Sequence, residues 1–395
     1  MKKLFLITIL IGFISISKIF AQNYKDSLDM ELTNLYEQFN IPGMYVMILG
    51  NDNILYQKGF GYSNIERHQP FTAETIENIG SVSKTFVAVA LMKAIDLKYF
   101  TLESNINDIL PFKVVNPFFP NEIIKVKDLT THTSSIIDND SIYHKSYRFI
   151  KTDSTDNKAI AVLNELGYTG GLRDSTLSTF LKSYLSKEGL SYREDNFFDS
   201  KPGKRYNYSN IASALAAYLI EIKSGLSFSD FTQKYVLKPL KMDNSSWFLN
   251  EIPSGHHAIP YHSREVSFPF YSLTTYPDGG LRASASDLSK YISEMIHGVN
   301  GQSNLLSKES FEEMISPKFS TENTPDNSNL AYRNKGVFWN IYPSGYIGHD
   351  GDDPGVSTNI LFNENTGIIF MANIYLDDRS SFLKILEKYA QKIAN

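Results

Sequence analysis

A serine and a lysine lie three residues apart at the start of a strongly apolar segment. The stretch GSVSKTF, residues 80–86, contains Ser81 and Lys84, and residues 86–92 carry almost no polar side chain. A helix that is apolar on all sides is typical of the interior of a large domain. We therefore expect a central buried helix in which Ser81 and Lys84 share one face and can meet.

Two physical effects favour the uncharged form of Lys84. Burial removes an ammonium group from water, and the first turn of a helix carries the positive end of the backbone dipole. An uncharged lysine can accept a proton, so Ser81 and Lys84 would be a nucleophile beside its base. The structural alternative is that Ser81 caps the helix while Lys84 extends to solvent. The spacing alone does not decide, because Ser15 and Lys18 repeat it near the N-terminus.

A tyrosine and an asparagine stand directly before a second apolar helix. Tyr208 and Asn210 lie in the stretch PGKRYNYSNIASALAAYLIE. A phenol there can exchange a proton with the serine or the leaving group, and the amide can bond both Lys84 and a substrate carbonyl. The alternative is that the tyrosine anchors a loop while Asn210 caps the helix. The tripeptide alone is weak evidence, because residues 62–64 repeat it at a predicted hairpin end.

A histidine and a glycine lie in a strand-like run near the C-terminus, in the stretch YIGHDGDDPGVSTNILF. Gly351 would let a substrate backbone approach closely, and the amide after it can point at a reacting carbonyl. His349 titrates near neutrality, which permits catalysis, although a lone histidine is more often structural. The other histidines have no comparable setting and are expected to be structural: His68, His132, His144, His256, His257, His262 and His297.

Strand-like segments occur at both ends of the chain, with helical segments between them. A helical stripe at residues 28–39 precedes two apolar runs around residues 51–53, which predict a β-hairpin. Four strand-like runs begin at residue 336, and a helix at residues 380–395 closes the chain. We expect an α+β fold with one antiparallel sheet built from both chain ends, terminal helices on one face and a large, mostly helical insertion on the other.

Several predicted helices in the insertion have clear end signals. One is expected to end at Gly189, one at Gly225, and one to begin after a Ser284 cap and stop at Gly298. Residues 138–200 are the least readable part of the chain and contain polar stretches that indicate surface loops.

The N-terminus has the pattern of a secretory signal peptide. Two lysines precede an apolar run that reaches Ile14, and Ala21 stands before the polar segment that begins at Gln22. Lys18 interrupts the run too early for a transmembrane span, which needs about 20 apolar residues. We expect residues 1–21 to be removed and the mature protein to be secreted or periplasmic, without a membrane span.

Composition narrows the functional classes further. The chain has no cysteine, so neither a disulfide nor a lipid-modified cysteine can form. The formal net charge of −5 becomes −8 once the three lysines of the leader are removed, which argues against nucleic acid as a partner. No repeat or linker appears, and residues 22–395 are expected to be a single catalytic domain. Its sheet lobe would comprise about residues 22–70 and 330–395, and its helical lobe about residues 70–330.

The three motifs together resemble those of the serine β-lactamase and penicillin-binding-protein superfamily. S-x-x-K at Ser81, Y-x-N at Tyr208 and H-x-G at His349 occur in that family's order, with supporting stretches LTTHTSS, PGKRYNYSN and DGGLRASASDL. The resemblance covers about residues 30–390 and is strongest to the class C branch with its related esterases and D-amino-acid peptidases.

The resemblance implies a role for each matched residue. Ser81 would be the acylated nucleophile, Lys84 its proton partner, Tyr208 a general acid and base, and Asn210 a positioning group. The amides of Ser81 and Asp352 would form the oxyanion hole, beside His349 and Gly351. No cofactor or metal is implied.

Two positions depart from the family pattern. The third motif of class C β-lactamases is K-T-G, whereas here it is His-Asp-Gly, so an imidazole replaces a fixed ammonium group. Ser135 stands where similar sequences often carry glycine. If a cation is needed for a substrate carboxylate, Arg282 or Lys204 would have to supply it.

The leading hypothesis is a secreted serine hydrolase that acts through an acyl-enzyme at Ser81 on an ester, an amide or a D-amino-acid peptide bond. Because His349 replaces the lysine, we expect simple esters and peptides with uncharged tails to be better substrates than cephalosporins. The alternatives are a true β-lactamase or DD-carboxypeptidase, and a non-catalytic sensor or binding module. The expected partner is a small molecule or peptide, and the sequence leaves the oligomeric state open.

Overall fold

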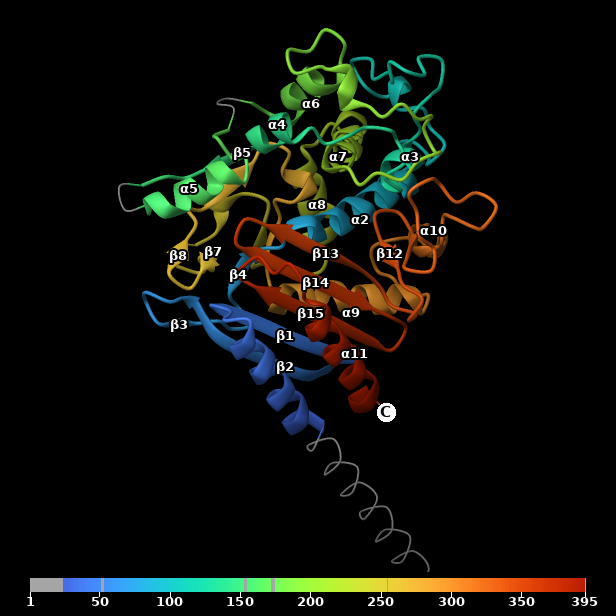
Figure 1. The fold of residues 1–395 in the computed structure, drawn as a ribbon. Coiled ribbons are helices and arrows are strands. Elements are labelled where there is room, and N and C mark those ends of the chain that lie inside the picture. Colours follow the sequence, from blue (N-terminus) through green and yellow to red (C-terminus); the bar gives the residue numbers. More distant parts are fainter. Residues whose placement is uncertain (1–23, 51–52, 153–154, 172–174, 254, 395) are drawn as a thin grey trace, which may run out of the picture.

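A computed structural model describes residues 24–50, 53–152, 155–171, 175–253 and 255–394. Its main feature is an eight-stranded sheet between two helical layers (Figure 1), in the order β11-β12-β13-β14-β15-β1-β2-β3. Every pair of neighbouring strands in this sheet is antiparallel, and the sheet draws on both ends of the chain, as predicted. The strands are β1 (Gly43–Gly50), β2 (Asn53–Asn64), β3 (Gln69–Pro70), β11 (Asn334–Lys335), β12 (Asn340–Ile341), β13 (Ile347–Asp353), β14 (Val356–Phe362) and β15 (Thr366–Ala372).

The centre of the sheet is buried on both faces. In β1, Val46 and Ile48 point to the core under the terminal helices, whereas Met47 and Leu49 point to the larger core of the helical lobe. Successive side chains of a strand alternate between faces, so a strand between two cores must be apolar at nearly every position. This explains why β1 and β15 are continuous apolar runs.

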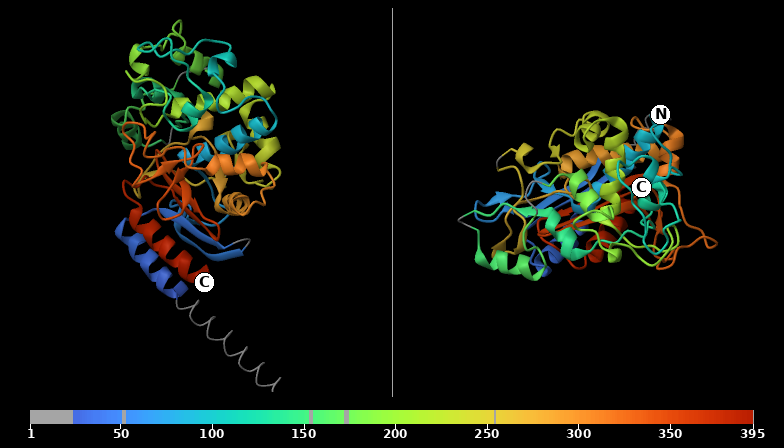
Figure 2. Two further views of the ribbon diagram at one scale, coloured as in Figure 1. Left: turned by 90° about the vertical axis from the view of Figure 1, so that its right-hand side faces the viewer. Right: turned by 90° about the horizontal axis from the view of Figure 1, so that it is seen from above.

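The terminal helices cover one face of the sheet. The helix at residues 24–38 and α11 (Ser380–Ala394) lie side by side in both views (Figures 1 and 2). Lys388 Nζ lies 2.8 Å from Glu31 Oε1, and the Tyr389 hydroxyl donates to the same oxygen at 2.7 Å. These exposed polar contacts join the two ends of the chain above the apolar layer.

The opposite face carries the helical lobe, with α2 (Ser83–Asp96) at its centre. α2 packs against α7 (Asn210–Ser224) and α10 (Lys308–Ile315), while α9 (Ala285–Val299) packs on β1 and β15. The lobe also contains α3 (Val126–Thr130), α4 (Asp140–Tyr143), α5 (Asn157–Glu165), α6 (Leu177–Leu185) and α8 (Phe228–Thr232). Small sheets join β4 (Ile76–Asn78), β10 (Arg282–Ser284) and β6 (Ser245–Ser246), β5 (Tyr147–Phe149) and β9 (Tyr271–Leu273), and β7 (Tyr261–Ser263) and β8 (Val266–Ser267).

Some local predictions are correct and others are wrong. α7 ends at Gly225, whose φ of 71° is the left-handed conformation that glycine adopts easily, and Ser284 caps α9. α6 ends at Leu185, before the predicted Gly189, because Ser186 is already extended. Residues 336–339 were expected to form a strand, but the amides of Val337 and Phe338 bond to the helical lobe instead, donating to the carbonyls of Met314 and Thr130.

Other predictions stay predictions. The signal peptide at residues 1–21 lies outside the described residues, and the lobe boundaries near residues 70 and 330 are expectations from sequence alone. In the described part of the chain no single helix has the length and apolarity of a membrane span. Residues 210–224 and 228–237 reach that length and apolarity only when taken together, across a bend of 81°.

We expect Phe382→Ala to destabilise the protein by about 3–5 kcal/mol, because it leaves a cavity between the sheet and the terminal helices. Phe382 is fully buried, with its ring 5.6 Å from that of Phe39 and 5.2 Å from that of Phe370. Urea unfolding would measure the loss. Met30→Ala is the control, since Met30 is 62% exposed and its truncation should change stability by less than about 0.5 kcal/mol. Equal effects of the two substitutions would contradict this packing.

Candidate active site

Ser81 lies in a tight turn between β4 and α2. The turn spans Gly80–Val82, and its first amide donates to Asn78 Oδ1 at 2.7 Å. Gly80 has a φ of +51°, and a Cβ there would lie 2.8 Å from the Asp352 amide nitrogen. A larger residue would therefore displace either the turn or β13. Ser81 itself is partly exposed, so a substrate can reach its hydroxyl.

Lys84 is fully buried and makes hydrogen bonds to three oxygens. Its Nζ lies 2.9 Å from Ser81 Oγ, 2.6 Å from Asn210 Oδ1 and 2.6 Å from the Asp278 carbonyl oxygen. The amide oxygen and the carbonyl oxygen can only accept hydrogen bonds. An uncharged amine can therefore donate to those two and accept from the Ser81 hydroxyl. The predicted meeting of Ser81 and Lys84 is present, and Lys84 does not extend to solvent.

The surroundings of Lys84 act on its charge in opposite directions. Burial is the largest influence and lowers the pKa of Lys84 from its usual value. The carboxyl groups of Asp278, Asp138 and Asp353 oppose this shift. Because desolvation prevails, the uncharged amine is easier to reach here than in water.

Asp138 fixes the start of α7 and with it the Y-x-N motif. Its carboxylate accepts from the Asn210 amide at 2.6 Å, the Ile211 amide at 3.0 Å and the Ser209 hydroxyl at 2.9 Å. Amides at the N-terminus of a helix have no partner within the helix, and an acidic group there also interacts favourably with the dipole. Ser209, rather than Asn210, is the capping residue, so the Asn210 side chain is free to contact Lys84.

Tyr208 presents a phenol to the Ser81–Lys84 pair. Lys84 Nζ lies 5.0 Å from the centroid of its ring. The hydroxyl oxygen is buried and makes no hydrogen bond of ordinary geometry. Burial raises the pKa of Tyr208 well above its usual value, and the neighbouring Ser81 side chain opposes this shift. Tyr208 is therefore a protonated phenol at neutral pH.

Two buried histidines flank Tyr208, with ring centroids 4.5 Å away for His132 and 6.3 Å away for His349. His349 Nδ1 lies 2.6 Å from the Asp350 carbonyl oxygen, so Nδ1 carries the proton and the buried Nε2 is an acceptor without a partner. His132 Nδ1 accepts from the Ser209 amide at 3.2 Å, so its proton is on Nε2. Burial lowers the pKa of both histidines, which keeps them neutral.

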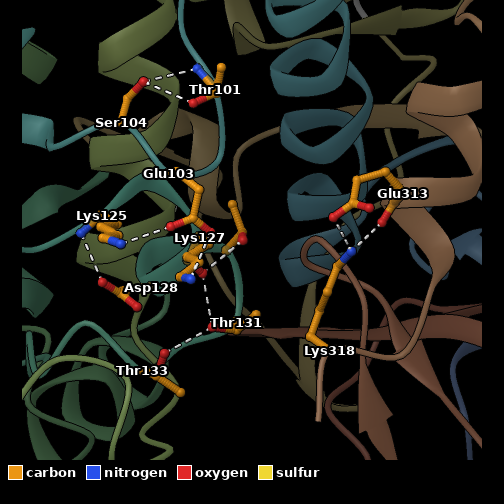
Figure 3. A network of polar contacts seen from close by, with 11 residues as sticks. Thr101, Glu103, Ser104, Lys125, Lys127, Asp128, Thr131, Thr133, Glu313 and Lys318 are labelled. Carbon is orange, nitrogen blue, oxygen red and sulfur yellow. Dashed lines mark hydrogen bonds and ion pairs between the residues drawn. The ribbon is translucent and has the colours of Figure 1, made fainter.

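Polar contacts hold the loop that carries His132 (Figure 3). Lys125 and Lys127 both reach Glu103, at 2.8 and 2.7 Å, and Asp128 accepts from the Lys125 amide at 2.8 Å. Thr131 contacts both the Lys127 carbonyl and the Thr133 hydroxyl at 2.9 Å. These bonds fix α3 and the turn after it. The expectation that His132 is only structural missed its position beside Tyr208.

The H-x-G strand passes directly beside the Ser81 turn. A Cβ at Gly351 would lie 2.1 Å from the Ile79 carbonyl oxygen and 3.1 Å from the Ser81 amide nitrogen, so only glycine fits. Asp352 follows in β13, and its carboxylate binds the Arg379 guanidinium with both oxygens, the Nη2–Oδ2 distance being 2.7 Å. The amides of Ser81 and Asp352 therefore lie on two segments in contact, and Arg379 restrains one of them.

The structure also shows what the sequence analysis missed. Lys335 is buried near His349, and its Nζ donates to Asn340 Oδ1 at 2.5 Å. Arg282, which was expected as a compensating cation, is instead buried against backbone carbonyls, at 2.9 Å from that of Gly280. Lys335 stands in the polar stretch YRNK, where no periodic pattern signals its burial.

Across the described residues, no group of three or more His, Asp or Glu side chains is placed to hold a metal ion.

Two bacterial proteins have amino-acid sequences similar to this chain. Protein flp of Staphylococcus aureus strain MRSA252 is 25% identical over 364 residues, an alignment that takes in 89% of this chain and 63% of that protein. The chain thus spans less than two thirds of that relative's length. Penicillin-binding protein 4* of Bacillus subtilis strain 168 is 24% identical over 371 residues, with 89% of this chain and 72% of that protein covered.

Solved structures share the fold. An octameric penicillin-binding protein homologue from Pyrococcus abyssi superposes with a TM-score of 0.74 at 25% identity, covering 94% of this chain and 77% of that one. A class C β-lactamase superposes with a TM-score of 0.67 at 19% identity, covering 93% and 96%. The model of the family described as Beta-lactamase matches residues 28–380, a range that contains every residue gathered around Lys84. The chain therefore belongs to the beta-lactamase family.

Proposed function

We propose that this protein is a serine hydrolase that forms an acyl-enzyme at Ser81. One observation carries the proposal. Of the three oxygens bonded to Lys84 Nζ, only the Ser81 hydroxyl has a proton to give. A buried amine that can be uncharged, placed 2.9 Å from a partly exposed hydroxyl, makes that hydroxyl an activated nucleophile.

In the proposed acylation Lys84 takes the proton of Ser81 as the oxygen attacks the substrate carbonyl. The amides of Ser81 and Asp352 would receive the negative charge that develops on the carbonyl oxygen. Tyr208 then gives its proton to the leaving group, a role that suits a phenol kept protonated by burial. The proton held by Lys84 returns to Tyr208, which restores both groups.

In the hydrolysis of the acyl-enzyme, Lys84 is again the proton acceptor. Water gives a proton to Lys84 as its oxygen attacks the ester carbonyl, and Lys84 passes that proton to the Ser81 oxygen as the serine leaves. Asn210 would hold the Lys84 amine in place through both steps, since its Oδ1 lies 2.6 Å from Nζ. No cofactor or metal ion takes part in this scheme.

The proposed substrates are esters, amides or D-amino-acid peptides. His349 stands where class C β-lactamases carry the lysine of K-T-G, and it is buried and neutral. A neutral imidazole provides no fixed charge for a substrate carboxylate. This favours substrates that do not need a cation at that position, so p-nitrophenyl esters should be hydrolysed faster than nitrocefin.

We further propose that the protein is exported. If residues 1–21 are a signal peptide, N-terminal sequencing of the protein recovered from outside the cytoplasm should begin at Gln22, either free or cyclised. Recovery of that protein with Met1 at its N-terminus would contradict the proposal.

A fluorophosphonate probe should label Ser81 in the wild-type protein, as peptide mass mapping can establish. Lys84→Arg should slow labelling by about 10²–10⁴-fold, because a guanidinium group cannot give up its proton to act as a base. Lys93→Arg is the matched control: Lys93 lies on the same helix and donates to the Leu305 carbonyl, at 2.8 Å, away from Ser81.

Two results would count against the mechanism. A folded wild-type protein without label at Ser81 would refute the acyl-enzyme, and normal labelling of the Lys84→Arg variant would refute the role of the amine. Circular dichroism spectra of each variant would establish that it is folded.

The neutral state of His349 predicts a pH-dependent stability. Its pKa in the folded protein is below the unfolded value of about 6.5, so the unfolded chain takes up a proton there first as the pH falls. Relative to His349→Gln, the wild type should lose about 1.4 kcal/mol per pH unit below pH 6.5, until the folded pKa is reached. Urea unfolding of both proteins at pH 7.5, 6 and 5 would measure this. A stability difference independent of pH would mean that His349 is not held neutral.

A further inference from the structure

A pocket with two basic side chains borders the extended segment that carries Tyr206 and Tyr208. Its volume is about 120 Å³, and its lining includes Tyr206, Ser328, Arg333 and Lys335 but no aspartate or glutamate. A bulk water molecule occupies about 30 Å³, so the pocket has room for a group the size of a carboxylate. Its lining therefore carries two basic side chains and no acidic ones, and most of its accessible surface is apolar.

The polar groups of this pocket can donate hydrogen bonds that nothing accepts. The hydroxyls of Tyr206 and Ser328 are buried and donate no hydrogen bond of ordinary geometry, and the nearby Arg333 side chain works to lower the pKa of Tyr206. Lys335 Nζ has one acceptor, Asn340 Oδ1, and two further protons when it is charged. Among the residues that the structure describes, no carboxylate forms an ion pair with Arg333, and its nearest acidic influence is Asp350. Buried donors without acceptors are costly unless a ligand satisfies them.

The pocket adjoins the catalytic tyrosine. Tyr206 and Tyr208 lie on one extended segment, and the His132 ring contacts both, with centroids 6.2 and 4.5 Å away. Lys335 Nζ lies 5.1 Å from the centroid of the Tyr206 ring, and its positive charge contributes to lowering the pKa of His349. The lining of the pocket contains Tyr206 and Lys335 but neither Ser81 nor Tyr208, so a substrate that used both sites would have to span the distance between them.

The charge of the pocket suits a single negative charge. Arg333 and protonated Lys335 carry two positive charges, and the ionised Asp350 behind them carries one negative charge. Burial lowers the pKa of Lys335 to about 7, and an entering anion would favour its protonated form. A carboxylate would neutralise the remaining positive charge, whereas a doubly charged phosphate would exceed it.

We propose that Arg333 and Lys335, with the hydroxyls of Tyr206 and Ser328, form a subsite that binds a carboxylate of the substrate. This subsite lies outside the H-x-G motif and replaces the cation that His349 does not provide. The inference rests on the proposed hydrolase activity, and it narrows the substrate class to acyl compounds that carry a carboxylate away from the scissile bond. It also revises the expectation that uncharged tails are preferred.

The test compares two esters that differ only in this charge: mono-p-nitrophenyl glutarate and its methyl ester. For the wild type, kcat/KM should be about 10-fold or more higher for the acid. Arg333→Gln should bring the acid-to-methyl-ester ratio close to one, mainly through KM. Lys204→Gln removes a nearby exposed charge outside the pocket and should leave the ratio as it is in the wild type.

The outcomes separate this inference from the hydrolase proposal. Hydrolysis of both esters at equal rates, or a ratio unchanged by Arg333→Gln, would overturn the subsite while leaving the acyl-enzyme intact. Hydrolysis of neither, without label at Ser81, would overturn the hydrolase.

A binding measurement is independent of turnover. By calorimetry, Ser81→Ala protein should bind monomethyl glutarate but not dimethyl glutarate, and Arg333→Gln introduced into that protein should abolish binding. Binding of inorganic phosphate without binding of monomethyl glutarate would overturn the carboxylate assignment.

Discussion

Lys84 Nζ lies where three distant segments of the chain meet, within hydrogen-bond distance of Ser81 Oγ, Asn210 Oδ1 and the Asp278 carbonyl oxygen. An amine in this position is costly if charged, because it is fully buried in the first turn of a helix. Because burial favours the uncharged form of the amine, Lys84 can accept a proton. The carboxyl groups of Asp138, Asp278 and Asp353 partly offset the effect of burial on its pKa, so the amine can change charge while it keeps its three hydrogen bonds.

The rest of the fold excludes water from the Lys84 amine and holds it against its three hydrogen-bond partners. α2 is buried along nearly its whole length because α7, α10 and α8 pack around it. The sheet carries the helical lobe on one face, where α9 packs on β1 and β15, and the two terminal helices cover the other face (Figure 2). Asn78 joins the Ser81 turn to β13 by contacting both the Gly80 amide, at 2.7 Å, and Asp353 Oδ2, at 3.2 Å. Residues far apart in the sequence thus hold the Ser81 turn against β13.

The sequence predicted whatever depends on local pattern. The alternation and apolar runs of β1, β2 and β15, the Gly225 helix end and the meeting of Ser81 with Lys84 all follow from neighbouring residues. What it missed depends on contacts far along the chain. Asp138 resembles a loop residue until α7 is placed against it, and residues 336–339 look like a strand until the amides of Val337 and Phe338 bond to the helical lobe. Lys335 was not recognised for the same reason, since nothing in its own segment indicates that it is buried.

The central claim is that Lys84 loses its proton more easily than an ordinary lysine, because it is buried. NMR can measure this directly, by following the ¹³Cε shift of Lys84 in protein labelled with [¹³C]lysine from pH 6 to pH 11. The signal would be assigned by its absence in Lys84→Arg. Our account predicts a midpoint clearly below the ordinary lysine value of about 10.4. A midpoint at or above that value would mean that Lys84 is a permanent cation in the free protein, and would contradict its role as the base for Ser81.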